Sequence, residues 1–204
     1  MRTTIITGGS MTDYAYIRQF IKPDDFIIAV DSGYRHAERL GVVPRVLLGD
    51  FDSIGELPQG IETHRVPEKK DFSDTDFAVD WAMAQGMCDF LILGAIGTRM
   101  DHTLTTILLL DRLLAAGARG QIIDEHNHIW ITETELEVAG DPGGILSLVP
   151  ITVCEGVTTH NLVYPLVDAT LQIGHGWSVS NVISESPVKV SLTAGKMLVL
   201  LCRD

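Results

Sequence analysis

The chain has 204 residues, 46% of them hydrophobic, which is enough for a substantial core in one large domain or two small ones. Its net charge of -12 argues against a nucleic-acid partner, because phosphate backbones are bound by basic surfaces. No stretch reaches the ~18–20 apolar residues of a membrane span, and the apolar run at the N-terminus is too short for a signal peptide.

Short apolar runs alternate with helical patterns through the first half of the chain. The predicted strands cover residues 3–7, 25–30, 45–48 and 90–93. The predicted helices cover a stretch that ends near residue 20, and residues 34–40, 75–85 and 103–116. This alternation predicts a three-layer α/β domain with a mostly parallel sheet over residues 1–120. In such sheets ligands bind at the carboxyl ends of the strands.

The pattern changes after about Gly120, where short β-branched or alternating runs are separated by turns. The predicted strands there are 121–124, 128–132, 144–149, 170–173, 188–192 and 197–202. Strands at this spacing predict a β-sandwich or flattened barrel over residues 121–204. The three cysteines are far apart and lack metal-ligand spacing, so we expect a cytoplasmic protein with reduced thiols.

Asp50 and Asp52 stand two residues apart at the end of a predicted strand, after Gly49. If the strand geometry continues, both carboxylates leave on the same face and can share a divalent cation. The alternative is an Asx-turn, in which the side chains accept hydrogen bonds from nearby backbone N–H groups. The preceding glycine favours the metal site.

A second acidic stretch, Asp71 to Asp76, opens the predicted helix 75–85. Ser73 and Asp76 resemble a capping box, and acidic residues suit the first turn of a helix. Capping does not account for all the acidic residues here together with Lys70, because a lysine at a helix N-terminus is electrostatically unfavourable. A lysine that reaches a phosphate, beside carboxylates that hold Mg²⁺, accounts for both.

A third stretch, residues 97–102, joins a predicted strand to a predicted helix. Backbone N–H groups at a helix start bind anions, and the Arg99 guanidinium matches phosphate oxygens. Alternatively, Asp101 caps the helix and Arg99 is a surface residue. In the second half, Trp177 is either a packing residue or a surface on which a flat heterocycle stacks, with Ser180 and Asn181 at the edge of its ring.

Taken together, these stretches resemble the thiamine pyrophosphokinase family over nearly the whole chain. The motifs that carry the resemblance are Asp31-Ser32-Gly33, Gly49-Asp50-Phe51-Asp52-Ser53, Lys70-Asp71-x-Ser73-Asp74, Gly94 to His102, Asp124-x-x-Asn127 and Ser180-Asn181. The resemblance implies an N-terminal α/β domain, a C-terminal β-sandwich and a homodimer, with thiamine bound where the α/β domain of one subunit meets the β domain of the other. It also implies Mg²⁺-dependent transfer of a diphosphoryl group from ATP to thiamine, giving thiamine diphosphate and AMP.

The resemblance also assigns roles to individual residues. The implied catalytic residues are Asp50, Asp52, Asp71 and Asp74, and of these Asp50, Asp52 and Asp74 are the implied Mg²⁺ ligands. The implied nucleotide and phosphate site comprises Asp31, Ser32, Lys70, Arg99, Asp101 and His102. The residues implied to face thiamine are Trp177, Ser178, Ser180 and Asn181.

Two positions depart from the family pattern: Ser32 and Thr98 stand where glycine is usual. Each places a side chain where backbone approaches phosphate, so each bears on nucleotide affinity or choice. A non-catalytic nucleotide or thiamine sensor on the same fold is the alternative function, and a structural α/β protein with capping aspartates is a third. Magnesium-dependent ATP binding separates the third from the first two.

Overall fold

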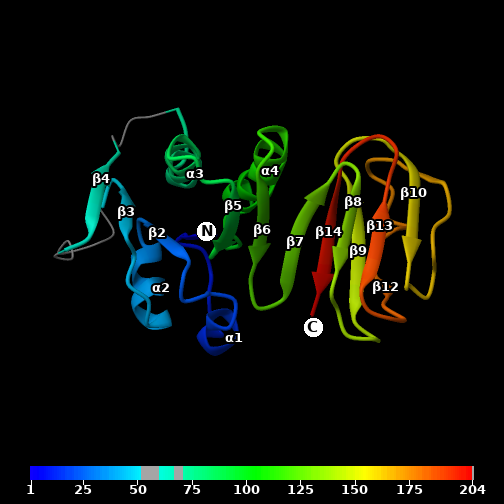
Figure 1. The fold of residues 1–204 in the computed structure, drawn as a ribbon, viewed down its shortest axis with the longest axis horizontal. Helices are drawn as coiled ribbons and strands as arrows, with labels where there is room; N and C mark the ends of the chain where they lie inside the picture. Colours follow the sequence, from blue (N-terminus) through cyan, green and yellow to red (C-terminus); the bar gives the residue numbers. More distant parts are fainter. Residues whose placement is uncertain (52–59, 67–70, 204) are drawn as a thin grey trace. The chain divides into compact units, whose positions relative to one another are not determined.

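The computed structural model describes residues 1–51, 60–66 and 71–203, which form two compact units, residues 1–125 and 126–204 (Figure 1). Asp52 and Lys70, two of the expected site residues, lie outside the described ranges. None of the helices that the structure describes is long and apolar enough to cross a membrane.

The first unit is built on a parallel sheet with β1 in its middle. Its strands are β1 (Thr3–Ile6), β2 (Phe26–Val30), β3 (Val46–Gly49), β4 (Glu62–Arg65), β5 (Asp89–Leu93) and β6 (Arg119–Ile123). They stand in the order β6-β5-β1-β2-β3-β4, and every neighbouring pair is parallel. The chain winds outward from β1 to β4 and then returns to the other side of β1, so β1 and β5 flank the switch point at which such sheets bind ligands.

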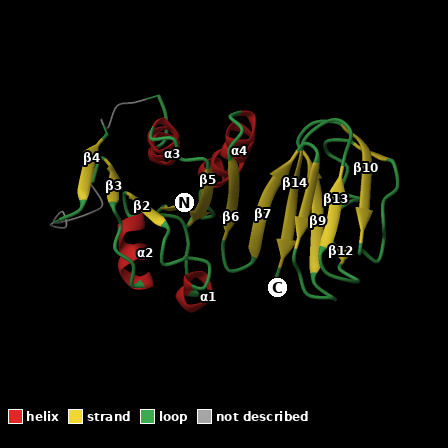
Figure 2. Ribbon diagram, viewed as in Figure 1, coloured by secondary structure: helices red, strands yellow, loops and turns green. Residues whose placement is uncertain are grey.

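Helices cover both faces of this sheet, as Figure 2 shows. The helices are α1 (Tyr14–Arg18), α2 (Gly33–Leu40), α3 (Asp74–Ala84) and α4 (Met100–Ala115). In Figure 1, α1 and α2 lie on one face of the sheet and α3 and α4 on the other. Apolar side chains of the sheet, such as Ile6 and Leu91, pack with Ile17 of α1 and Leu40 of α2 in one buried cluster. The prediction of a three-layer, mostly parallel α/β fold is confirmed.

Two elements of the first unit differ from the prediction. β4 was not predicted, because its sequence Glu-Thr-His-Arg is polar; it is an edge strand with little burial. α4 begins at Met100 rather than at residue 103, although Arg99 at its N-cap makes no side-chain capping hydrogen bond. Asp101 and His102 therefore lie inside the first helical turn.

The second unit consists of antiparallel strands. They are β7 (Asn127–Thr132), β8 (Glu135–Val138), β9 (Ile145–Pro150), β10 (Cys154–His160), β11 (Ala169–Leu171), β12 (Asn181–Val182), β13 (Val188–Ser191) and β14 (Met197–Cys202). One sheet has the order β12-β9-β14-β7 and the other β11-β10-β13-β8. Both contribute to one core, for example Leu148 and Val199 from the first and Val157 and Val190 from the second. The predicted β-sandwich is confirmed.

The sequence pattern missed β8, β10 and β12 and placed residues 121–124 at the start of the β-rich half. β10 contains Gly156 in a left-handed conformation (φ 65°) at an irregularity in its pairing with β11, which obscures the alternation. β6 instead pairs in parallel with β5, so it completes the sheet of the first unit. The functional division into residues 1–120 and 121–204 stays a prediction.

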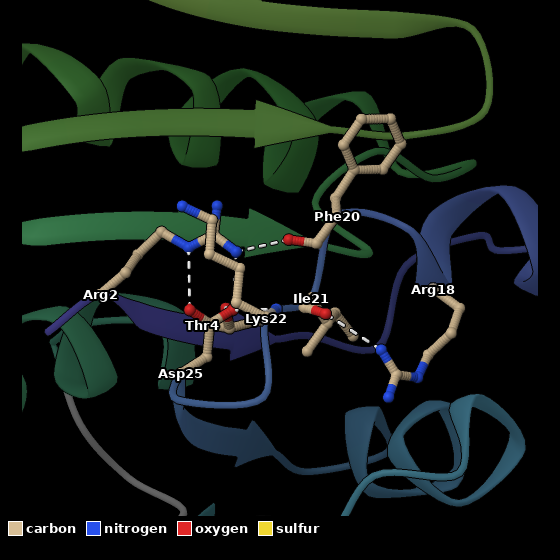
Figure 3. A network of polar contacts seen from close by, with 7 residues as sticks. All are labelled: Arg2, Thr4, Arg18, Phe20, Ile21, Lys22 and Asp25. Atoms are coloured by element: carbon tan, nitrogen blue, oxygen red, sulfur yellow. Dashed lines mark hydrogen bonds and ion pairs between the residues drawn. The ribbon is translucent and has the colours of Figure 1, made fainter.

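Figure 3 shows a polar network that ties the start of β1 to the segment before β2. Arg2 donates to both oxygens of Asp25, from Nε at 3.1 Å and from Nη2 at 2.6 Å, and also to the Phe20 carbonyl. The Thr4 hydroxyl and the Lys22 N–H donate to Asp25 as well, each at 2.9 Å. Burial acts to raise the pKa of Asp25, but these hydrogen bonds outweigh it and the pKa is lowered.

Candidate functional site

A cavity of about 530 Å³ opens at the carboxyl ends of β1, β2 and β5, the edge of the sheet that the strand order indicates. Its lining comes from the turn after β1, the end of β2, the approach to α3, the turn after β5 and the start of α4. All these segments belong to the first unit. The cavity is large enough for a ligand of nucleotide size.

Glycines let the backbone of two turns approach closely in this cavity. A Cβ on Gly9 would lie 2.2 Å from the Gly94 carbonyl oxygen, and a Cβ on Gly8 would lie 1.9 Å from the Ser32 hydroxyl. The Gly9 N–H donates to the Gly94 carbonyl at 2.8 Å, and the Ser10 N–H donates to the Ile96 carbonyl at 2.8 Å. One wall of the cavity is therefore packed backbone, where a larger side chain has no room.

Asp31 is the most perturbed acid of this site. It directly follows β2 and has a left-handed backbone conformation (φ 45°), which non-glycine residues rarely adopt. Burial, and then the neighbouring carboxyls of Asp74 and Asp50, raise the pKa of Asp31 to about 7, although a hydrogen bond from the Phe51 N–H acts in the opposite direction. Its Oδ1 is buried and has no hydrogen-bond partner among the described residues. Asp31 thus lies close to both Asp74 and Asp50, and a hydrogen bond with the Asp74 side chain also raises its pKa.

Gly49 makes this arrangement possible. Its φ of 145° suits glycine, and a Cβ there would lie 1.7 Å from Oδ1 of Asp31. Because Gly49 immediately precedes Asp50, the same residue makes room for one carboxylate and positions the next. Position 49 therefore requires glycine, because any side chain there would clash with Asp31.

The start of α3 brings Asp74 to the cavity. The predicted capping box is confirmed: the Ser73 hydroxyl accepts from the Asp76 N–H at 3.1 Å, and the Asp76 carboxylate accepts from the Ser73 N–H at 3.2 Å. Asp76 also pairs with Arg112 of α4 at 3.6 Å. Asp76 is thus a structural residue, whereas Asp74 lines the cavity and Asp71, which is exposed, does not.

At the start of α4, Arg99 and His102 line the cavity, while Asp101 does not. Arg99 donates to both oxygens of Asp101, at 3.2 and 2.5 Å. Hydrogen bonding to Arg99 is the main cause that lowers the pKa of Asp101 to about 2. Both side chains are largely exposed, 70% for Arg99 and 64% for Asp101, so water and salt screen the pair and a phosphate can compete for the guanidinium.

The residues expected to face thiamine all lie in the second unit and differ in how free their side chains are. Trp177 is 55% exposed, whereas Ser178 is buried and donates to the Leu148 carbonyl at 2.8 Å. Ser180 has a left-handed backbone (φ 57°). The Asn181 side chain accepts from the Tyr164 N–H at 3.1 Å and donates to its carbonyl at 2.6 Å.

The structure brings five expected residues to the cavity: Asp31, Ser32, Asp74, Arg99 and His102. Asp50 lies beside Asp31 but not in the lining, and Asp71 and Asp101 are also outside it. Sequence reasoning missed Thr103 and Thr106, which line the cavity from one face of α4. Their three-residue spacing, which puts both side chains on one face of the helix, was the available indication.

The donors of this site suit a hard divalent cation, because Asp31, Asp50 and Asp74 offer carboxylate oxygens and one buried oxygen lacks a partner. Among the described residues, no three acidic, histidine or cysteine side chains are already arranged as a set of metal ligands. Asp52, an expected ligand, is not among the residues described. The chemistry of the site therefore fits Mg²⁺, with the ligand set itself a prediction.

The fold and the site define a class of protein in which a parallel α/β unit with a strand-end cavity precedes an antiparallel β-sandwich. Residues 17–120 match the family model of the thiamin pyrophosphokinase catalytic domain, and residues 133–197 match that of the thiamin pyrophosphokinase vitamin B1 binding domain. The chain belongs to the thiamin pyrophosphokinase family. It is accordingly an enzyme, a kinase-type transferase of the thiamine diphosphokinase class.

Individual relatives agree with this assignment over the full length. The chain is 27% identical to the thiamine pyrophosphokinase of Bacillus subtilis (strain 168), over 98% of both chains. The crystal structure of thiamine pyrophosphokinase from Bacillus subtilis matches with a TM-score of 0.90 and 25% identity, covering 100% of both chains. That of thiamin pyrophosphokinase from Geobacillus thermodenitrificans has a TM-score of 0.85 and 25% identity, covering 100% of this chain and 98% of the other.

Proposed function

We propose that this enzyme transfers the diphosphoryl group of ATP to the hydroxyl of thiamine, with Mg²⁺ bound, and releases thiamine diphosphate and AMP. The observation that carries the proposal is the cavity at the strand ends, which Asp31, Asp74 and Arg99 line and beside which Asp50 lies close to Asp31. Carboxylates that repel one another need a cation among them, and a triphosphate needs cations around it. Mg²⁺ and ATP together satisfy both requirements.

We assign the metal and the nucleotide to different sets of residues. We assign Mg²⁺ to Asp50, Asp52 and Asp74, where it neutralises charge on the triphosphate. The nucleotide and its phosphates are assigned to Asp31, Ser32, Lys70, Arg99, Asp101 and His102. Arg99 gives up its exposed pairing with Asp101 when a phosphate oxygen accepts from the guanidinium.

In the chemical step the thiamine hydroxyl oxygen attacks the β-phosphorus. The bond from that phosphorus to the oxygen bridging it to the α-phosphorus breaks, and AMP leaves with that oxygen. Positioning and charge neutralisation account for most of the catalysis in such transfers. Asp71 or Asp74 accepts the hydroxyl proton, and the pH–rate profiles of Asp71→Asn and Asp74→Asn distinguish the two. If neither substitution changes the profile, no aspartate of this stretch is the base.

Thiamine binding is assigned to Trp177, Ser178, Ser180 and Asn181. The exposed Trp177 ring supports a stacking role. The hydrogen bonds of Ser178 and Asn181 within the β-sandwich support an indirect role, in which these residues hold the loop that presents Trp177. We expect Trp177→Ala to raise the KM for thiamine more than that for ATP.

We also propose that the enzyme is a cytoplasmic homodimer. Exposed apolar side chains gather in both units, with Met100, Leu104 and Leu108 at four-residue spacing on α4 and Tyr164 and Val167 in the β-rich unit. Such surface suits burial between subunits. Light scattering coupled to size-exclusion chromatography tests the proposal: it predicts twice the chain mass, and a monomer at micromolar concentration contradicts it.

The decisive experiment mixes the protein with Mg²⁺, ATP and thiamine and measures AMP and thiamine diphosphate. Equal amounts of the two products are expected. Release of ADP instead of AMP would contradict diphosphoryl transfer. Binding of both substrates without turnover would support the alternative, a sensor on the same fold.

A further inference from the structure

Three side chains form a hydrogen-bonded row behind the glycine turn of the cavity. His36 of α2 contacts the Gly9 carbonyl oxygen through Nε2 at 2.8 Å. The Tyr14 hydroxyl of α1 contacts Nδ1 of the same ring at 2.7 Å, and Arg39 donates to that hydroxyl at 3.1 Å. Gly9 lines the cavity, whereas the three side chains behind it do not. The row therefore reaches the site only through the Gly9 peptide.

The donor groups determine which partner donates in each hydrogen bond of this row. A guanidinium can only donate, so the Tyr14 oxygen accepts from Arg39 and its O–H is free to donate to Nδ1 of His36. The proton of the neutral imidazole is then on Nε2, the tautomer inferred from this network, and it is donated to Gly9. Arg39 also lies over the Tyr14 ring, with its guanidinium carbon 5.6 Å from the ring centre.

The peptide that joins Gly9 to Ser10 is held at both of its polar groups. Position 9 requires glycine, because a Cβ there would lie 2.2 Å from the Gly94 carbonyl oxygen, and a glycine backbone is not restricted by a side chain. The N–H of this peptide, that of Ser10, donates to the Ile96 carbonyl at 2.8 Å, and its carbonyl oxygen, that of Gly9, is bound by His36. A carbonyl oxygen carries partial negative charge, so an orientation toward the cavity would repel a phosphate.

We propose that His36, oriented by Tyr14, is a positioning residue that holds the Gly9 carbonyl oxygen toward α2 and away from the cavity. The wall of the cavity then presents no carbonyl dipole of this peptide to an anionic ligand. The inference rests on the proposed function in one respect, namely that the triphosphate of the nucleotide occupies this cavity. Loss of the row should weaken binding of polyphosphate selectively, with thiamine binding unaffected.

The test uses calorimetry with Mg²⁺ and inorganic tripolyphosphate, and steady-state kinetics with ATP and thiamine. His36→Leu should weaken tripolyphosphate binding about 10-fold, the effect of one lost hydrogen bond. The KM for ATP should rise by a similar factor while that for thiamine stays constant. His36→Gln can still donate to Gly9 and should recover most of the affinity. Tyr14→Phe leaves His36 without its partner and should cost about 3-fold.

His160→Leu is the matched control, because His160 is exposed at the end of β10 in the other unit. Wild-type affinity in a folded His36→Leu variant overturns the inference, and so does an equal rise of both KM values. If His36→Leu does not fold, Tyr14→Phe decides, and wild-type affinity there overturns it. A wild-type protein that binds no tripolyphosphate overturns the proposed function as well, so the two failures are distinguished by the wild-type titration.

Discussion

Asp31 combines a left-handed backbone, burial and two neighbouring carboxyls at one position. Each of these costs stability in the ligand-free protein, and such costs concentrate at functional sites. A cation among the carboxyls converts the repulsion into attraction. Asp31 should therefore lower the stability of the ligand-free protein and favour binding of a cation.

Replacing Asp31 with Asn separates the two effects. Asn tolerates the left-handed conformation and carries no charge, so Asp31→Asn should stabilise the protein in EDTA at pH 8 by about 1–3 kcal/mol. The same variant should bind ATP with Mg²⁺ at least about 10-fold more weakly. Thermal unfolding and calorimetry measure the two quantities. Asp24→Asn removes one exposed charge and is the control; an equal gain in both variants would contradict the role of crowding.

A side chain at position 49 should displace the Asp31 carboxyl by steric contact. Gly49→Ala places a Cβ 1.7 Å from Oδ1 of Asp31 and forces an alanine into a conformation that suits glycine. We expect a loss of about 2–4 kcal/mol in the free energy of unfolding, together with weaker ATP binding. Gly86→Ala is the control, because Gly86 also has a positive φ (81°) but open space around it. Chemical denaturation of both variants isolates the steric part.

For single residues, the sequence indicated which acidic side chains belong near the site better than it indicated where each one points. Asp31 and Asp74 could be assigned because they follow a strand and open a helix, and strand ends meet at one edge of a parallel sheet. Asp101 pairs with Arg99 and lies outside the cavity lining, since α4 starts three residues earlier than predicted, and the nucleotide-binding role of Asp101 stays a prediction. Helix starts without a capping side chain cannot be located from local sequence.

Among the elements, apolar strands were predictable and polar or irregular ones were not. β1, β2 and β5 are short apolar runs closed by turns, and each is present close to its predicted position. β4 and β10 are strands because of their neighbours, through pairing with β3 and with β11 and β13. Tertiary pairing of this kind leaves little trace in the local pattern.

The network of Arg2 and Asp25 anchors the segment that enters β2, and its strength should depend on pH. The pKa of Asp25 is lowered on folding, so its contribution is present above the unfolded pKa and is lost as pH falls through the folded pKa. The Asp25 side chain is only 1% exposed, and Asp25→Asn should cost about 2–4 kcal/mol at pH 7. The difference in melting temperature from wild type should shrink below pH 4.

An exposed ion pair provides the comparison for that prediction. Lys189 and Glu137 lie 2.8 Å apart with side chains that are 56% and 59% exposed. Glu137→Gln should leave the melting temperature unchanged within error, because water and salt screen the pair. A constant penalty for Asp25→Asn from pH 7 to pH 3 would show that packing, rather than the carboxylate charge, accounts for its effect.

On the scale of the whole molecule, 27 acidic residues outnumber 15 lysines and arginines. A molecule with this balance repels ATP, and the carboxyls of Asp31, Asp50 and Asp74 at the cavity add to that repulsion locally. The arrangement makes sense only if a cation accompanies the nucleotide. Under the proposed function, Asp50, Asp52 and Asp74 would hold the Mg²⁺ that offsets this repulsion.

ATP affinity should therefore fall at least about 100-fold when EDTA removes Mg²⁺, which is more than 2.7 kcal/mol. Calorimetry at fixed ionic strength measures the change, and adenosine, which has no phosphates, is the control whose binding should not respond to EDTA. Added NaCl should recover part of the loss in EDTA, because salt screens the repulsion. Equal ATP affinity with and without Mg²⁺ would mean that the carboxyls serve another purpose, such as pairing with the cationic ring of thiamine.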